Sequence, residues 1–193
     1  MRSASLAILR PLATVRGRWI AAATLVPALT ALGAYVRLPL PGTTVPFTLQ
    51  TFFVLLFGVL LGARASAAGQ GLYLALGGLG VPFFTWGSGW SYLAGETGGY
   101  LFGFVLGGAI VGLLARRGAC TPIVPLALAL TAGATTILVL GAVHYAAVRG
   151  LPMVPAFVQG VLPFLPGEVA KVAAVTATVR LARLGGIGGG STD

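Results

Sequence analysis

The amino-acid sequence predicts an all-α integral membrane protein with six transmembrane helices. Of its 193 residues, 57% are hydrophobic and only 8% are charged, and the mean hydropathy is +0.98. An average soluble domain is about 25% charged. A helix needs about 20 mainly apolar residues to cross a bilayer, and six stretches meet this length to within a few residues: 19–36, 47–63, 65–84, 98–115, 123–148 and 166–182. Only the last of them carries charges inside it.

The distribution of basic residues predicts that both termini are cytoplasmic. Lysine and arginine collect at the cytoplasmic ends of membrane spans. With the N-terminus inside, Arg37 and Arg149 lie outside and Lys171 lies within a span, whereas the other nine of the twelve basic residues are cytoplasmic: Arg2, Arg10, Arg16, Arg18, Arg64, Arg116, Arg117, Arg180 and Arg183. We therefore divide the chain into a basic cytoplasmic segment (1–18), a transmembrane domain (19–183) and a flexible tail (184–193). A cleaved signal peptide is disfavoured, because the first apolar run exceeds the usual 7 to 15 residues and five further spans follow.

The sequence lacks the residue patterns that several classes of function require. The single cysteine, Cys120, excludes an intrachain disulfide and a cysteine-based zinc site. There is no GxxxxGK[ST] phosphate-binding motif and no pattern typical of a metal or nucleophile site. The net charge of +9 does not suggest a nucleic-acid partner, because the basic residues lie at the ends of apolar runs. We therefore expect neither an enzyme nor a cofactor.

Small residues recur within the spans at intervals of four. Gly99, Gly103 and Gly107 form one such row, Gly108 and Gly112 lie beside it, and Gly58 and Gly62 repeat the spacing. Small residues let helix backbones approach closely in lipid. We expect internal helix packing, with a groove for a partner protein as the alternative.

Two ionisable residues stand out in the last span. Glu168 and Lys171 are three residues apart and share one helical face, so they can pair. Charges inside a membrane are costly and by default mark functional sites. A purely structural ion pair near the headgroups is the alternative.

The outer loops supply residues for a pocket beside this pair. Segment 39–50 offers Thr43, Thr44, Thr48 and Gln50, and segment 83–100 offers Trp86, Trp90, Tyr92 and Tyr100. The proline-studded stretch 151–166 cannot be a regular helix, and irregular backbone at membrane depth must face protein or a cavity. We expect an outward-facing site with aromatic walls and few polar anchors, which suits a small molecule.

Several of these residues also have a simpler structural explanation. Thr44 or Thr48 can cap the following helix, Trp90 and Tyr92 can belong to the interfacial aromatic belt, and Glu96 can be a solvated carboxylate near a helix N-terminus. His144, alone in the fifth span, is best explained as a packed or hydrogen-bonded core residue.

The sequence resembles a known family, BioY, the biotin-binding S components of energy-coupling factor (ECF) transporters. The resemblance covers nearly the whole chain, and four segments carry it: VPFTLQTFFVLLFGVLLGAR (45–64), GLYLALGGLGVPFF (71–84), GETGGYLFGF (95–104) and LPGEVAKV (165–172). It implies an S-component-like six-helix bundle in a prokaryotic plasma membrane that captures biotin at the outer face.

The resemblance also implies roles for particular residues. A carboxylate and a lysine on the last helix contact the ligand in this family, which corresponds to Glu168 and Lys171 here. Gly98, Gly99 and Tyr100 match a GGY element, and Thr48, Leu49 and Gln50 match a TLQ element. The expected binding set has eight members: Glu168, Lys171, Tyr100, Gly98, Gly99, Gln50, Thr43 and Trp86. The chain departs from the family in having Glu168 where Asp is common and Glu96 where Pro is common.

Partners follow from the same resemblance. They would be a transmembrane coupling protein and two cytoplasmic ATPases, with docking through the first three helices, where Ala21, Ala28 and Ala31 offer small residues. Three alternatives remain open from the residues alone: an S component for another vitamin, a proton-coupled transporter that uses Glu168 or His144, and a membrane scaffold without a ligand.

Overall fold

The computed structural model describes residues 14–115 and 122–182. Within them, six long helices correspond to the six predicted spans: α2 (Val15–Tyr35), α3 (Gln50–Leu61), α4 (Ala63–Gly78), α6 (Gly98–Leu114), α7 (Ile123–Arg149) and α9 (Leu165–Ala182). The tail at 184–193, Cys120 and most of the N-terminal basic segment lie outside the described residues.

Three stretches of the described chain are long and apolar enough to cross a membrane. They are α2, α7 and the helical stretch Met153–Ala182, while α3 and α6 are apolar but shorter. At 1.5 Å per residue, the 12 residues of α3 extend only about 18 Å. Helical fold and apolar character therefore agree with the prediction, whereas the number of spans remains a prediction.

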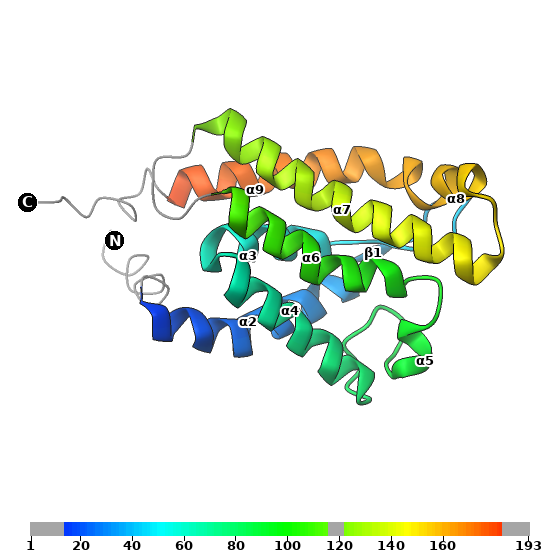
Figure 1. Ribbon diagram of the computed structural model, residues 1–193, viewed down its shortest axis with the longest axis horizontal. Helices are drawn as coiled ribbons and strands as arrows, with labels where there is room; N and C mark the ends of the chain where they lie inside the picture. Colours follow the sequence, from blue (N-terminus) through cyan, green and yellow to red (C-terminus); the bar gives the residue numbers. More distant parts are fainter. Residues whose placement is uncertain (1–13, 116–121, 183–193) are drawn as a thin grey trace, which may run out of the picture.

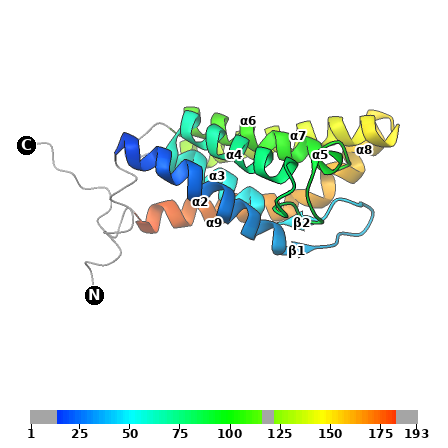
Figure 2. The same cartoon turned by 90° about the horizontal axis from the view of Figure 1, so that it is seen from below.

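The elements run side by side along the long axis of the molecule. The start of α2 and the end of α9 lie at one end, and the short helices α5 (Trp90–Leu93) and α8 (Met153–Gly160) lie at the other (Figure 1). The same end carries the loop of a small antiparallel hairpin formed by β1 (Arg37–Leu38) and β2 (Phe47–Thr48) (Figure 2). We call this the hairpin end.

Two predicted stretches differ from the structure. The third span was expected to reach residue 84, but α4 ends at Gly78, and Gly80, at φ 109°, turns the chain into an irregular segment. The hairpin also shortens the second span, because Phe47 and Thr48 are extended and α3 begins only at Gln50.

The stretch 151–166 is not one regular helix, as predicted, but most of it is helical and not irregular. This stretch contains α8, the 3-10 helix η1 (Leu162–Phe164) and the start of α9. Pro155, Pro163 and Pro166 each fall within the first three residues of a helical segment. Backbone N–H groups there have no partner within the helix, so proline removes no hydrogen bond.

The glycine rows pack helices of this chain against one another, as predicted. A Cβ at Gly103 would lie 2.9 Å from Ile137 Cα on α7, and one at Gly58 would lie 2.7 Å from Val111 Cβ on α6. Real Cβ atoms are essentially never found this close. The contacts at Gly58, Gly103 and Gly107 are therefore internal, and these glycines do not form an open groove for a partner.

Two of the three predicted docking alanines are buried within the described part of the chain. Ala21 packs in a hydrophobic cluster with Phe57 and Leu61 of α3. Ala31 belongs to a second hydrophobic cluster, which also contains Val45 and Tyr73. Ala21 and Ala31 are both 5% exposed or less. Of the three, Ala28 alone is exposed, and docking through these alanines stays a prediction.

Candidate functional site

A pocket opens at the hairpin end, among α3, α6, α7, α9 and the hairpin. The space between its atoms amounts to about 490 Å³, the solvent at its open mouth included. Four of the eight residues in the expected binding set line it: Gln50, Tyr100, Glu168 and Lys171. The structure thus brings together side chains from three helices that are up to 121 positions apart in sequence (50 to 171).

Glu168 and Lys171 form an ion pair in the pocket wall. Lys171 Nζ donates to Glu168 Oε1 at 2.6 Å, and the two side chains are only 8% and 5% exposed, respectively. The spacing of three residues on α9 places them one turn apart on one face. The pair neutralises two charges that would otherwise be expensive to bury.

The second oxygen of Glu168 has an unused acceptor capacity. Glu168 Oε2 is buried and accepts no hydrogen bond from the residues that the structure describes. A buried polar atom without a partner is costly. The pair is therefore suited to receive an N–H donor from a ligand at this carboxylate.

Gln50 presents its amide to the pocket in a fixed orientation. Thr48 donates to Gln50 Oε1 at 3.1 Å, Gln50 Nε2 donates to the Tyr73 hydroxyl at 2.6 Å, and that hydroxyl donates to the Phe83 carbonyl at 3.1 Å. An amide has two N–H donors and two acceptor lone pairs. One donor and one lone pair of Gln50 therefore remain for a ligand.

Tyr100 lines the pocket with its ring and does not offer a hydrogen-bond donor to a ligand. Its hydroxyl donates to the carbonyl of Gly160 at 2.6 Å, so its proton is already used. Its ring lies 5.9 Å from that of Phe164 and covers Gly141, where a Cβ would collide with it. The aromatic rings of Tyr92, Phe104 and Phe164 complete the apolar lining.

Four predicted site residues do not line the pocket. Gly98 and Gly99 allow α6 to approach Leu93 and the His144 region of α7, so their role is close packing. The Thr43 hydroxyl accepts from the Val45 backbone N–H at 3.2 Å and shapes the loop. Trp86 is 61% exposed and stacks on the Arg37 guanidinium at 3.9 Å, outside the pocket.

Sequence reasoning missed several lining residues, including Thr51, Thr85 and Thr97. Single threonines gave no signal in the sequence, because their position relative to the pocket depends on how the helices and loops pack. Tyr92, which was expected to be either a wall of the site or part of an aromatic belt, does line the pocket and stacks on Phe84 at 5.0 Å.

The threonines proposed as helix caps have other partners. The N-cap of α3 is Leu49, without a side-chain hydrogen bond. The Thr44 hydroxyl donates to Glu96 Oε2, and Thr48 contacts Gln50. The capping interpretation was therefore wrong for both residues.

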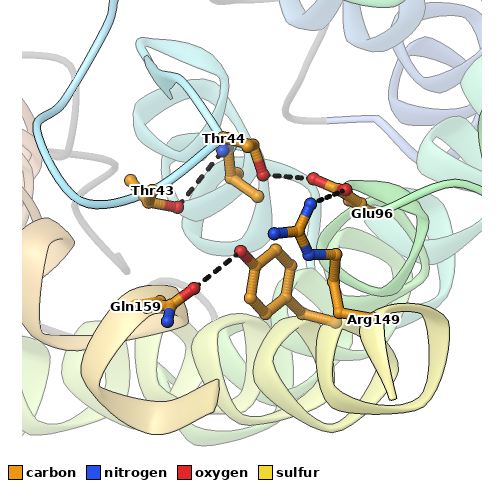
Figure 3. Close-up of polar contacts among 7 residues, drawn as sticks. Thr43, Thr44, Glu96, Arg149 and Gln159 are labelled. Carbon is orange, nitrogen blue, oxygen red and sulfur yellow. Dashed lines mark hydrogen bonds and ion pairs between the residues drawn. The ribbon is translucent and has the colours of Figure 1, made fainter. Parts of the chain in front are cut away.

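Glu96, in the loop before α6, contacts both the hairpin loop and the end of α7. It accepts from Thr44 of the hairpin loop through Oε2 and pairs through Oε1 with Arg149 at the end of α7, at 3.0 Å (Figure 3). Nearby, the Tyr145 hydroxyl donates to Gln159 of α8 at 3.1 Å. Glu96 is therefore a partnered carboxylate and not simply a solvated one.

The remaining ionisable residue of interest, His144, is hydrogen-bonded as expected, with its Nε2 3.0 Å from the Gly95 carbonyl. Among the described residues, no three His, Cys, Asp or Glu side chains are grouped closely enough to hold a metal ion.

A family model described as the BioY family matches residues 7–185. This chain belongs to the BioY family. A relative from Pyrococcus horikoshii, named a probable biotin transporter BioY, is 33% identical over 81% of this chain and 91% of its own length.

Other BioY relatives match more closely over a shorter part. A probable biotin transporter BioY from Lysinibacillus sphaericus is 47% identical, and the biotin transporter BioY from Thermotoga maritima is 45% identical. Both matches cover 47% of this chain, and they cover 45% and 53% of the respective relatives. The matched region thus spans about half the length of these two relatives.

A solved structure supports the fold of this BioY protein. The biotin S-component of an ECF-type ABC transporter superposes with a TM-score of 0.78 over 86% of this chain and 90% of that one, at 20% identity. The bundle predicted from the sequence therefore has the fold of a known S-component.

Proposed function

We propose that this protein captures biotin at the outer face of a prokaryotic plasma membrane, as the substrate-binding component of an ECF-type importer. The observation that carries the proposal is the buried Glu168–Lys171 pair, which presents a carboxylate oxygen without a partner beside an apolar pocket. The names of its BioY relatives support biotin as the ligand.

The chemistry of the pocket complements biotin. The ureido ring of biotin has two N–H donors and one carbonyl acceptor, and its side chain ends in a carboxylate. Glu168 Oε2 would accept an N–H, Lys171 would donate to a carbonyl or carboxylate oxygen, and Gln50 would supply a further donor. The rings of Tyr92, Phe104 and Phe164 would enclose the apolar bicycle and chain.

The membrane arrangement is part of the same proposal. Six spans with both termini in the cytoplasm would place the hairpin end outside, where Arg37 and Arg149 are the two basic residues on that side. Transport would require a transmembrane coupling protein and two cytoplasmic ATPases, since the sequence contains no phosphate-binding motif of its own. ATP would then be hydrolysed by these partners.

Equilibrium binding of biotin to the detergent-purified chain tests the proposal. We expect tight binding by the wild type and a loss of at least about 100-fold in Glu168→Gln and Lys171→Met, because each variant leaves a buried group unpaired, at a loss of several kcal/mol. Glu96→Gln makes the same chemical change outside the pocket and is the matched control. Absence of binding by folded wild-type protein would refute the biotin assignment, and equal effects of Glu96→Gln and Glu168→Gln would refute the site.

A further inference from the structure

We propose that Phe47 is a positioning residue for ligand binding, because its ring holds the Lys171 ammonium in the direction of the pocket. The ligand-binding part of this inference rests on the proposed function. The structural part concerns only the contact between the hairpin and α9, and it can be tested without a ligand.

The Phe47 ring lies directly against the functional face of α9. Lys171 Nζ is 4.0 Å from the centre of the ring, well within the distance at which a cation is attracted to an aromatic face. The ring also covers Gly167, where an added Cβ would lie 2.6 Å from Phe47 Cζ. The absence of a side chain at Gly167 therefore gives the ring its place beside Lys171.

Glu168 by itself does not fix the ammonium. Lysine carries a compact charge on a flexible four-carbon stem with three N–H donors. One N–H of the ammonium donates to Glu168 Oε1, and the face of the Phe47 ring lies against a second side of the ammonium. Since Phe47 does not line the pocket while Lys171 does, the ring acts through Lys171, and the remaining N–H is free for an acceptor on the ligand.

The position of Phe47 also connects Lys171 to the hairpin. Phe47 pairs with Leu38 in the two-stranded sheet, and the adjacent Val45, Pro46 and Thr48 line the pocket. The hairpin residues that line the pocket and the ion pair on α9 thus both adjoin the Phe47 ring. A shift of this ring would move the ammonium and the hairpin side of the pocket together.

The first test replaces Phe47 with mono-, di- and trifluorophenylalanine. Fluorine withdraws charge from the ring face and changes its shape very little, so a packing role would not respond to it. We expect the dissociation constant of biotin to rise progressively with each fluorine, by about 2- to 30-fold over the series. The same series at Phe102, an exposed ring on α6 outside the pocket, is expected to leave it unchanged. A flat response at Phe47 in protein that binds biotin would overturn the inference.

The second test measures thermal unfolding without a ligand. We expect Phe47→Leu to lower the midpoint more in the wild type than in a Glu168→Gln, Lys171→Met background, in which the ammonium is absent. Gly167→Ala, which pushes the ring away, should show the same dependence on Lys171. Equal losses in both backgrounds would overturn the inference even if wild-type protein fails to bind biotin, so the two proposals can fail separately.

Discussion

Two ion pairs of similar geometry lie in very different surroundings in this protein. Lys171 and Glu168 approach to 2.6 Å with side chains 5% and 8% exposed, whereas Arg149 and Glu96 approach to 3.0 Å with side chains 43% and 29% exposed. The first pair lines the pocket, and the second joins the loop before α6 to the end of α7 (Figure 3). Burial, rather than distance, separates their expected roles.

The physical difference is the solvent that each pair has lost. Charges removed from water suffer a desolvation penalty of several kcal/mol each, so a buried pair depends on both partners being present. An exposed pair loses little solvation and is screened by salt, and it typically contributes about 0 to 1 kcal/mol. The buried pair is therefore suited to bind a ligand, and the exposed pair to make a modest structural contribution.

The largest expected effect is the removal of one member of the buried pair. Lys171→Met should lower the free energy of unfolding by about 3 to 5 kcal/mol, because it leaves the Glu168 carboxylate buried without its partner. Denaturation in detergent measures this change. Arg149→Met removes a cation from the exposed pair and is the matched control, and an equally large loss in this variant would contradict the comparison.

The next effect separates stability from binding. Replacing both members together, by Glu168→Gln and Lys171→Met, should restore most of the stability that the single variant loses, because no unpaired charge remains. Biotin binding should stay lost, because the polar anchors are gone. Binding by this double variant, measured by isothermal titration, would show that the pair is only structural.

A smaller effect is expected at Gln50, which is oriented by Tyr73. Tyr73→Phe would leave Gln50 Nε2 without its acceptor and the Phe83 carbonyl without its donor. We expect a stability loss of about 1 to 3 kcal/mol and weaker biotin binding with the ion pair intact. Tyr145→Phe, which removes the hydroxyl that donates to Gln159, serves as a control, and its biotin affinity should not change.

The smallest effect is expected at the exposed pair. Glu96→Gln or Arg149→Gln should change stability by at most about 1 kcal/mol, and the change should shrink as salt is raised. Reversing both charges, as Glu96→Arg with Arg149→Glu, should recover part of the loss. A salt-independent loss of several kcal/mol would mean that this pair is as tightly held as the buried one.

Much of the fold could be predicted because it follows from local properties of the chain. Six apolar stretches of helical length correspond to six helices in the described residues, and glycines at intervals of four pack helices against one another. Glu168 and Lys171 were predicted to pair because their spacing places them on one face of a helix, whatever surrounds it.

The residues that surround the Glu168–Lys171 pair were harder to predict, because their positions depend on contacts between different helices of the bundle. Phe47, whose ring contacts Lys171, lies in a two-residue strand at the start of the second predicted span. Trp86 lies outside the pocket with its ring on the Arg37 guanidinium. The proline-rich stretch 151–166 forms short helical segments, in which Pro155, Pro163 and Pro166 lie in first turns and Pro152 is the N-cap of α8.

The sequence by itself determined the helical class, the apolar character and the ion pair, since periodicity and spacing act over one or two helical turns. Only the tertiary structure decided that Glu168 Oε2 is left without a partner, that Gln50 is oriented by Tyr73, and that Glu96 meets both Thr44 and Arg149. The contacts of Gln50 and Glu96 join residues 23 to 53 positions apart, and such contacts are set by how whole helices pack rather than by local preference.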